Sequence, residues 1–205
     1  MGQDNPVLLI VMLGLAGYVG KLWRDDYLAA RAGTPNPRAL PGATVCSLAA
    51  IAVAAAGALI LLGIETWGEY ALGIVGEQSR ITVLFGLYTL AAAFVEELIF
   101  RGFLVVENRG RVALVAGIVG ASLLFAVAHP FLWEWEDGTL SFHFTSTKAW
   151  FSTGVVFAAS LWFYAVRFLP MNPSRSLLPC IAAHAAKNLG VFAIKFAQGF
   201  VGDWW

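Results

Sequence analysis

The sequence predicts an all-α fold, a polytopic helical membrane protein with about six transmembrane helices. Hydrophobic residues occupy 59% of the 205 positions and charged residues only 13%, about half the usual charged share of a soluble domain. Apolar stretches of roughly 20 residues, the length that crosses the hydrocarbon core of a bilayer, recur along the chain. We expect a single integral membrane domain over residues 1–205, with a motif-bearing core at about residues 81–196.

Six segments meet the length criterion for a span. They lie at about residues 7–23, 43–64, 81–100 with a continuation to 106, 112–129, 149–169 and 177–197. The first is the shortest. The connector RAGTPNPRALPG at residues 31–42 breaks helix periodicity with glycines and prolines. The connector WEWEDGTLSFHFTSTK at residues 133–148 is expected to be an acidic, aromatic loop at a membrane interface.

The distribution of Lys and Arg predicts the orientation of these spans. Nine basic residues lie in or beside the first, third and fifth loops: Lys21, Arg24, Arg31, Arg38, Arg101, Arg109, Arg111, Arg167 and Arg175. Three lie on the opposite side: Arg80, Lys148 and Lys195. We therefore expect the odd-numbered loops in the cytoplasm and both termini outside.

Polar side chains interrupt three of the spans. A charge at the centre of a membrane helix costs roughly 2.5 to 3.5 kcal/mol on insertion scales, so such groups are retained mainly where they face a polar cavity and meet partners. The chain places two carboxylates, an arginine, two histidines, a lysine and an asparagine in or near hydrocarbon: Glu96, Glu97, Arg101, His129, His184, Lys187 and Asn188.

Helical spacing indicates which of these side chains meet. Residues four apart share a face, so Glu97 is predicted to pair with Arg101, and His184 and Asn188 to lie side by side. Glu96 lies about 100° around the helix from Glu97 and can point at another partner. The spacing predicts one glutamate that is neutralised by its arginine and one that is available for chemistry.

Each observation taken alone also has a structural interpretation. Glu97 and Arg101 can form an ion pair that serves stability only. His129 at a helix end is compatible with an interfacial or capping histidine, and His184 with Asn188 is compatible with hydrogen bonding between helices. Their occurrence together favours a functional site.

Three short motifs occur in order on separate hydrophobic segments: EELIFR at residues 96–101, FAVAH at 125–129 and HAAKN at 184–188. They resemble the EExxxR, FxxxH and HxxxN motifs of the CPBP family, intramembrane proteases related to the type II CAAX prenyl endopeptidase and to the Abi proteins. The runs FRGFL after the glutamates and SLLPCIAAH before the last motif agree with this resemblance. It covers about residues 81–196, whereas the first two spans are generic.

The resemblance implies a glutamic-type protease in which a glutamate and a histidine activate a water molecule that attacks the scissile amide. Glu96 takes the place of the general base and His129 helps to hold the water. His184 and Asn188 take the place of the oxyanion donors. The supporting residues are Glu97, Arg101 and Phe125.

Metal chemistry is the main alternative for the same residues. Two glutamates and two histidines can in principle bind zinc, but the chain has no HExxH motif and the ligands would come from three helices. We expect a mechanism without metal or other cofactor, and keep a metal-dependent version of the protease as an alternative. Neither Cys46 nor Cys180 has a basic partner in its local sequence, which disfavours a cysteine nucleophile.

Lys187 stands in the HAAKN motif where a small or polar residue is expected before the asparagine. It follows His184 by three positions, close enough to the same face to enter the site, pair with a glutamate or bind an acidic substrate group. The alternative is that its ammonium snorkels to the membrane interface. We prefer snorkelling.

The depth of these residues conflicts with a single site. Glu96 and His184 fall in the cytoplasmic half of their spans, whereas His129 ends a span on the outer side. At about 1.5 Å per residue the mismatch amounts to a few helical turns. Either the third helix runs on through residue 106 and the fourth begins late, which would bring both sets nearer the midplane, or the helices are tilted. We expect the first.

The predicted function is an intramembrane endopeptidase that acts on a membrane-anchored protein or peptide in the lipid bilayer, at a bacterial inner membrane. Basic residues are not gathered on any face, so no nucleic-acid partner is expected. One alternative is a non-proteolytic immunity or scaffold protein, which the intact motifs disfavour. Another is a small transporter, which the lack of paired broken helices or repeats disfavours.

Overall fold

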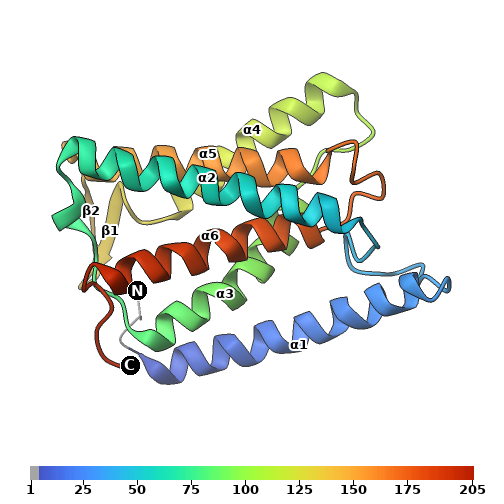
Figure 1. Cartoon of the computed structure of the whole chain (residues 1–205), viewed down its shortest axis with the longest axis horizontal. Helices are drawn as coiled ribbons and strands as arrows, with labels where there is room; N and C mark the ends of the chain where they lie inside the picture. The colour runs from blue at the N-terminus through green and yellow to red at the C-terminus, as the bar shows by residue number, and fades with distance from the viewer. Residues whose placement is uncertain (1–4) are drawn as a thin grey trace.

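The computed structural model describes residues 5–205, which form six long helices and one β-hairpin (Figure 1). The helices are α1 (Pro6–Arg31), α2 (Leu48–Leu72), α3 (Val83–Glu97), α4 (Arg111–Ala128), α5 (Thr147–Arg167) and α6 (Leu178–Ala197). The short elements are η1 (Val75–Glu77), η2 (Leu98–Phe103), β1 (Trp133–Glu136) and β2 (Thr139–Phe142). Five segments are long and apolar enough to cross a membrane, α3 with η2 being one and α6 not among them. The prediction of a polytopic helical membrane protein is confirmed.

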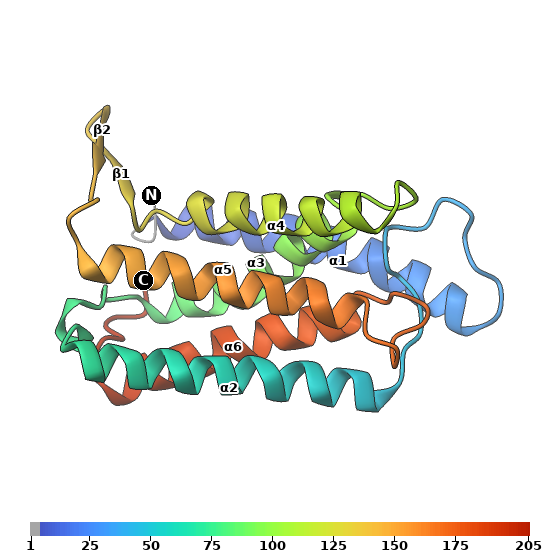
Figure 2. The same ribbon diagram turned by 90° about the horizontal axis from the view of Figure 1, so that it is seen from above.

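The helices form one bundle in which α6 lies between α3 on one side and α2 and α5 on the other (Figures 1 and 2). α1 packs on the outside of α3, and α4 packs on α5. The loops of residues 32–47, 104–110 and 168–177 gather at one end of the bundle. The start of α1, the hairpin and the C-terminal end of the chain lie at the other. The odd-numbered loops thus share one end of the bundle, as successive spans that cross in alternating directions require.

Side-chain caps fix where four of the helices begin. α1, α2, α3 and α5 each follow a residue whose side-chain oxygen accepts a hydrogen bond from a backbone N–H of the first turn: Asn5, Ser47, Thr82 and Ser146. The predicted second span, 43–64, is wrong at both ends. Ser47 caps α2 at Leu48, and α2 continues to Leu72, where Gly73 with φ of 70° ends it in the left-handed conformation.

α1 is the longest helix at 26 residues, although the first predicted span was the shortest. The apolar run ends at Trp23, but the helix continues through a charged segment to Arg31. Trp23 is 5% exposed and its indole N–H donates to the Pro41 carbonyl oxygen at 3.0 Å. Counting apolar residues finds the part of a helix that lies in hydrocarbon and misses a polar extension of the same helix.

Small residues allow α2 to approach its neighbours closely. Ala50, Ala54 and Ala58 recur every fourth position and are fully buried. A Cβ atom at Gly57 would lie 2.2 Å from the Trp162 ring of α5. The α2 face toward α5 and α6 is therefore shaped by residues without bulk, as is usual for helix contacts in membranes.

Residues 133–142 form an antiparallel hairpin where the sequence predicted a loop. β1 pairs with β2 from Trp133 opposite Phe142 to Glu136 opposite Thr139. Asp137 and Gly138 have φ of 49° and 77°, as a two-residue turn between paired strands requires. The Asp-Gly pair between two aromatic runs was the signal for this hairpin.

The third helix ends in a wider π-helical turn, η2, and leaves helical geometry at Leu104 with φ of −87° and ψ of 53°. The Tyr164 hydroxyl of α5 lies 2.6 Å from the Phe100 carbonyl oxygen and 3.2 Å from that of Leu104. The hydroxyl thus provides a hydrogen-bond donor for carbonyl oxygens that have no helical partner at the end of the helix. The predicted continuation to residue 106 and the late start of the fourth helix are both wrong, since α4 begins at Arg111.

Candidate active site

The predicted site residues lie on three parts of the bundle that come into contact with one another. α3 with η2 carries Glu96, Glu97 and Arg101; the end of α4 carries Phe125 and His129; α6 carries His184, Lys187 and Asn188. α6 packs on α3, and α5 packs on both α4 and α6. Helices that are distant in sequence thus bring these side chains into one region.

Glu97 and Arg101 form the predicted ion pair. Glu97 Oε1 lies 3.1 Å from Arg101 Nη1, and both side chains are fully buried. A third residue joins them, because Arg101 Nη2 donates to the Ser160 hydroxyl of α5 at 2.6 Å. The Ser160 hydroxyl donates in turn to that of Ser122 on α4 at 3.0 Å. The two serines were missed, since single serines in apolar helices carry no motif.

Aromatic rings surround the Arg101 guanidinium. Its Cζ lies 4.5 Å from the centre of the Phe125 ring, 4.9 Å from that of Tyr164 and 5.2 Å from that of Phe163. Such rings stabilise a cation through their negative faces. Arg101 had been counted among the basic residues of a connector; instead it is fully buried, and the count falls to eight against three.

Glu97 has a second partner that the sequence did not predict. Its Oε1 also lies 2.8 Å from His184 Nδ1. Because a carboxylate only accepts, Nδ1 carries the hydrogen in this contact. The other ring nitrogen, Nε2, then faces Glu96, whose Oε2 is 3.7 Å away. His184 also stacks on the Phe163 ring at 4.7 Å, which fixes the plane of its imidazole.

Glu96 differs from its neighbour in surroundings and in partners. Its side chain is 33% exposed whereas that of Glu97 is fully buried. At 3.7 Å the His184 contact is too long for a direct hydrogen bond. Within residues 5–205, no lysine or arginine pairs with Glu96. The helical geometry thus separates a paired glutamate from an unpaired one.

His129 follows the last residue of α4. Its Nδ1 lies 2.8 Å from the Phe125 carbonyl oxygen, so Nδ1 is the donor in this contact and Nε2 is not used by it. The Phe125 ring lies between the two histidines, 4.7 Å from that of His129 and 6.0 Å from that of His184. α3 runs obliquely to α2 in Figure 1, as the alternative of tilted helices requires.

Asn188 ties α6 to α3. Its Nδ2 donates to the Thr89 carbonyl oxygen at 2.9 Å. One N–H of the amide group is used by this contact and a second N–H remains. The contact fixes the side chain one helical turn from His184.

Lys187 does not snorkel, and that prediction is wrong. The residue is 7% exposed, and its Nζ lies 2.7 Å from Glu65 Oε2 of α2. Pairing with a glutamate was the alternative that the sequence left open, but Glu65 was not considered. The predicted span ended at residue 64, whereas α2 continues past it and brings Glu65 inside the bundle.

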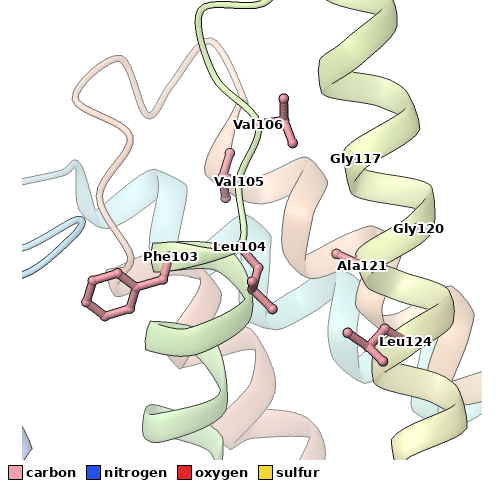
Figure 3. Close-up of a pocket in the computed structure, with 8 residues that line it drawn as sticks. All are labelled: Phe103, Leu104, Val105, Val106, Gly117, Gly120, Ala121 and Leu124. Carbon is pink, nitrogen blue, oxygen red and sulfur yellow. The ribbon is translucent and has the colours of Figure 1, made fainter.

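A cavity of about 370 Å³ opens between the 103–106 segment and α4 (Figure 3). Phe103 and Leu104 line one side, and Gly117, Gly120 and Leu124 line the other. None of the predicted site residues lines it. Among the described residues, no group of three or more His, Cys, Asp or Glu side chains is arranged to hold a metal ion.

Comparison with protein families places the motif-bearing part of the chain in a known family. A family model described as "Type II CAAX prenyl endopeptidase Rce1-like" matches residues 78–190, more than half of the chain. The matched range contains all three motifs and every predicted site residue from Glu96 to Asn188. No curated protein and no solved structure matches the chain.

Proposed function

The chain belongs to the Rce1-like family of type II CAAX prenyl endopeptidases, and from this premise we propose that it hydrolyses a peptide bond with a water molecule activated by Glu96. The family and the apolar helices support an integral membrane protein that is a CAAX-type protease. One observation carries the assignment of the base. Of the three carboxylates in the site region, Glu96 alone lacks a lysine or arginine partner within residues 5–205.

A general base needs a carboxylate that can reach water and take up a proton. Glu97 is unsuited because it is fully buried and bound to both Arg101 and His184. Glu65 is unsuited because it is paired with Lys187. Glu96, one third exposed, is the remaining candidate.

His129 and Glu96 hold the water molecule between them in this proposal. Because His129 Nδ1–H is bound to the Phe125 carbonyl oxygen, its Nε2 is free to accept a hydrogen bond from water. Glu96 accepts the second hydrogen of the same water and removes it as a proton. The hydroxide oxygen then forms a bond to the carbonyl carbon of the substrate.

His184 and Asn188 receive the negative charge that develops on the substrate oxygen. Asn188 contributes the amide N–H that the Thr89 contact does not use. His184 contributes Nε2–H when its ring carries both protons, with Nδ1–H kept on Glu97. When the tetrahedral intermediate collapses, the C–N bond breaks and the proton on Glu96 passes to the leaving amine. Donors held in place before the reaction stabilise such a charge strongly.

The substrate is a membrane-anchored protein or peptide, and the protein resides in a bacterial inner membrane. A site within a bundle of membrane-spanning helices meets substrates that are themselves held at the bilayer. Lys187 has no part in binding the substrate in this scheme, because Glu65 already takes its ammonium group.

The test is cleavage of membrane-anchored peptides by the purified protein in liposomes. Glu96→Gln keeps the size of the side chain but removes the base, so we expect a loss of about 10² to 10⁴ in rate with an unchanged melting temperature. Asn188→Ala should lose about 10² to 10³, and the double variant little more than Glu96→Gln, because residues that act as a unit are not additive.

The same assay contains its controls. Asn172→Ala removes another asparagine, which binds the Arg167 and Ser176 carbonyl oxygens away from the site, and should lower stability but not the rate per folded molecule. Full activity of Glu96→Gln would refute the assignment of the base. Activity lost to a chelator and restored by zinc would favour the metal-dependent alternative.

A further inference from the structure

Glu65 lies outside the three motifs, yet it contacts the helix that carries two of the proposed catalytic residues. Its Oε2 is 2.7 Å from Lys187 Nζ, and the two side chains are 18% and 9% exposed. A buried lysine requires a partner of opposite charge, because an isolated ammonium in a low-dielectric interior is strongly unfavourable. Glu65 supplies that charge from α2.

Lys187 is placed on α6 where its ammonium group could also pair with Glu96. Lys187 follows His184 by three positions and precedes Asn188, so it leaves α6 near the face that carries His184. Glu96 Oε2 lies 3.7 Å from His184 Nε2, so this carboxylate faces the same turn of α6 from the α3 side. The ammonium sits on a flexible four-carbon stem. Glu96, the carboxylate beside His184 that has no lysine or arginine partner within residues 5–205, is therefore the competitor of Glu65 for Lys187.

We propose that Glu65 is a positioning residue of the site, which holds the Lys187 ammonium on the α2 side of α6 and so keeps it from pairing with Glu96. This inference rests on the role of Glu96 as the general base. A cation bound to a carboxylate stabilises its ionised form and makes it a weaker base. Loss of Glu65 would thus reduce catalysis although Glu65 does not touch the reacting atoms.

A second ion pair on the same helix provides a matched control. Glu69 lies one turn after Glu65 and pairs with Lys148 of α5, while its second carboxylate oxygen accepts from Gln78 at 2.7 Å. Both pairs join α2 to a neighbouring helix and both are largely buried. Only the Glu65 pair involves the turn of α6 that carries His184 and Asn188.

The first experiment measures peptide cleavage per folded molecule. Glu65→Gln should lower kcat by at least about tenfold, a part of what a general base contributes. Glu65→Gln with Lys187→Met should restore kcat to within about threefold of the wild type, since no ammonium is left to pair with Glu96. Glu69→Gln should keep wild-type kcat. A double variant as slow as Glu65→Gln, or an equal loss in Glu69→Gln, would overturn the inference.

The double variant carries neither charge of the pair, so it remains informative where Glu65→Gln alone yields no folded protein. Activity near that of the wild type is expected. Activity as low as that of Glu96→Gln would show that the charged pair itself is required, which contradicts a role in keeping Lys187 from Glu96.

The second experiment needs no substrate and uses melting temperatures in detergent. When Glu65→Gln frees Lys187 to pair with Glu96, a further Glu96→Gln removes that new pair. Glu96→Gln should therefore lower Tm by about 3 °C or more beyond its effect in the wild type. Additive effects would overturn the inference.

The two experiments separate this inference from the function on which it rests. Coupled melting temperatures with a fully active Glu96→Gln would refute the proposed base and leave the exchange of partners intact. Additive melting temperatures with an inactive Glu96→Gln would refute the exchange and leave the base intact.

Discussion

At the scale of the residue, Glu97 has two roles: it pairs with Arg101 and it orients the His184 ring. One of its oxygens accepts from both Arg101 Nη1 and His184 Nδ1. The ion pair thereby also orients an imidazole on another helix, with Nε2 toward Glu96. Adjacent carboxylates on a helix point about 100° apart, which lets Glu97 be fully buried while the Glu96 side chain is one third exposed.

Removal of Arg101 should reveal how much of the fold depends on this buried pair. Arg101→Leu leaves the Glu97 carboxylate without its cation in a fully buried position, and we expect a loss of about 3 to 5 kcal/mol in unfolding free energy. The measurement is thermal or denaturant unfolding in detergent, together with the yield of folded protein.

Lys21→Leu is the matched control for Arg101→Leu. Lys21 pairs with Asp25 at the same four-residue spacing, but the two side chains are 68% and 49% exposed. Exposed pairs contribute little, so stability should be unchanged. If Arg101→Leu were as stable as this control, Arg101 would be a candidate for substrate binding instead of a structural partner.

At the scale of the element, close contact between α2 and its neighbours sets the distance across the site. Ala50, Ala54 and Ala58 present a flat face, and Gly57 accommodates the edge of Trp162. The Trp162 indole N–H donates to the Ala54 carbonyl oxygen at 2.9 Å, which fixes α5 against α2. Because Glu65 reaches Lys187 from the same helix, a shift of α2 would alter that contact.

Gly57→Ala should disturb this contact. The added Cβ would lie 2.2 Å from Trp162 Cζ2, and a rigid indole cannot withdraw as the end of a flexible chain can. We expect a loss of about 1 to 3 kcal/mol in unfolding free energy, the usual cost of overpacking. Thermal unfolding in detergent is the measurement.

Gly63→Ala, on the same helix, separates packing from helix propensity. A Cβ there meets nothing within 4 Å, and alanine favours a helix over glycine, so stability should be equal or slightly higher. Equal effects of the two substitutions would mean that the α2–α5 contact tolerates an extra methyl group.

At the scale of the whole molecule, the odd-numbered loops lie at one end of the bundle and the hairpin lies at the other (Figure 2). Arg101 is buried and is left out of the count of basic residues. Eight basic residues then remain at the end with the odd-numbered loops, against three at the other end. An excess of Lys and Arg marks the cytoplasmic side of a membrane protein. The orientation thus stays a prediction that labelling can test.

Cysteine labelling tests this orientation. In a variant without Cys46 and Cys180, single cysteines at the exposed positions 38 and 109 should react from the cytoplasmic side only. A cysteine at position 136, in the hairpin, should react from the outside only. Labelling of positions 109 and 136 from the same side would contradict the arrangement of the spans.

Length and hydrophobicity were sufficient to predict the class of fold and the number of helices. Five of the six spans were placed to within about two residues at their starts, because a helix in hydrocarbon must be apolar over a fixed length. The ends of α1 and α2 were missed because both helices extend into polar sequence. The hairpin was predicted as a loop, although the Asp-Gly pair at its turn is a local signal for two paired strands.

The sequence by itself determined the family and the pair formed by Glu97 and Arg101, because motif order and four-residue spacing are both properties of the linear chain. Only the tertiary structure decided that His184 binds Glu97 and that Lys187 binds Glu65. Each of these contacts joins residues at least 87 positions apart, on helices whose tilt and rotation depend on packing against every neighbour. Spacing along one helix carries no information about which side chain of another helix will face it.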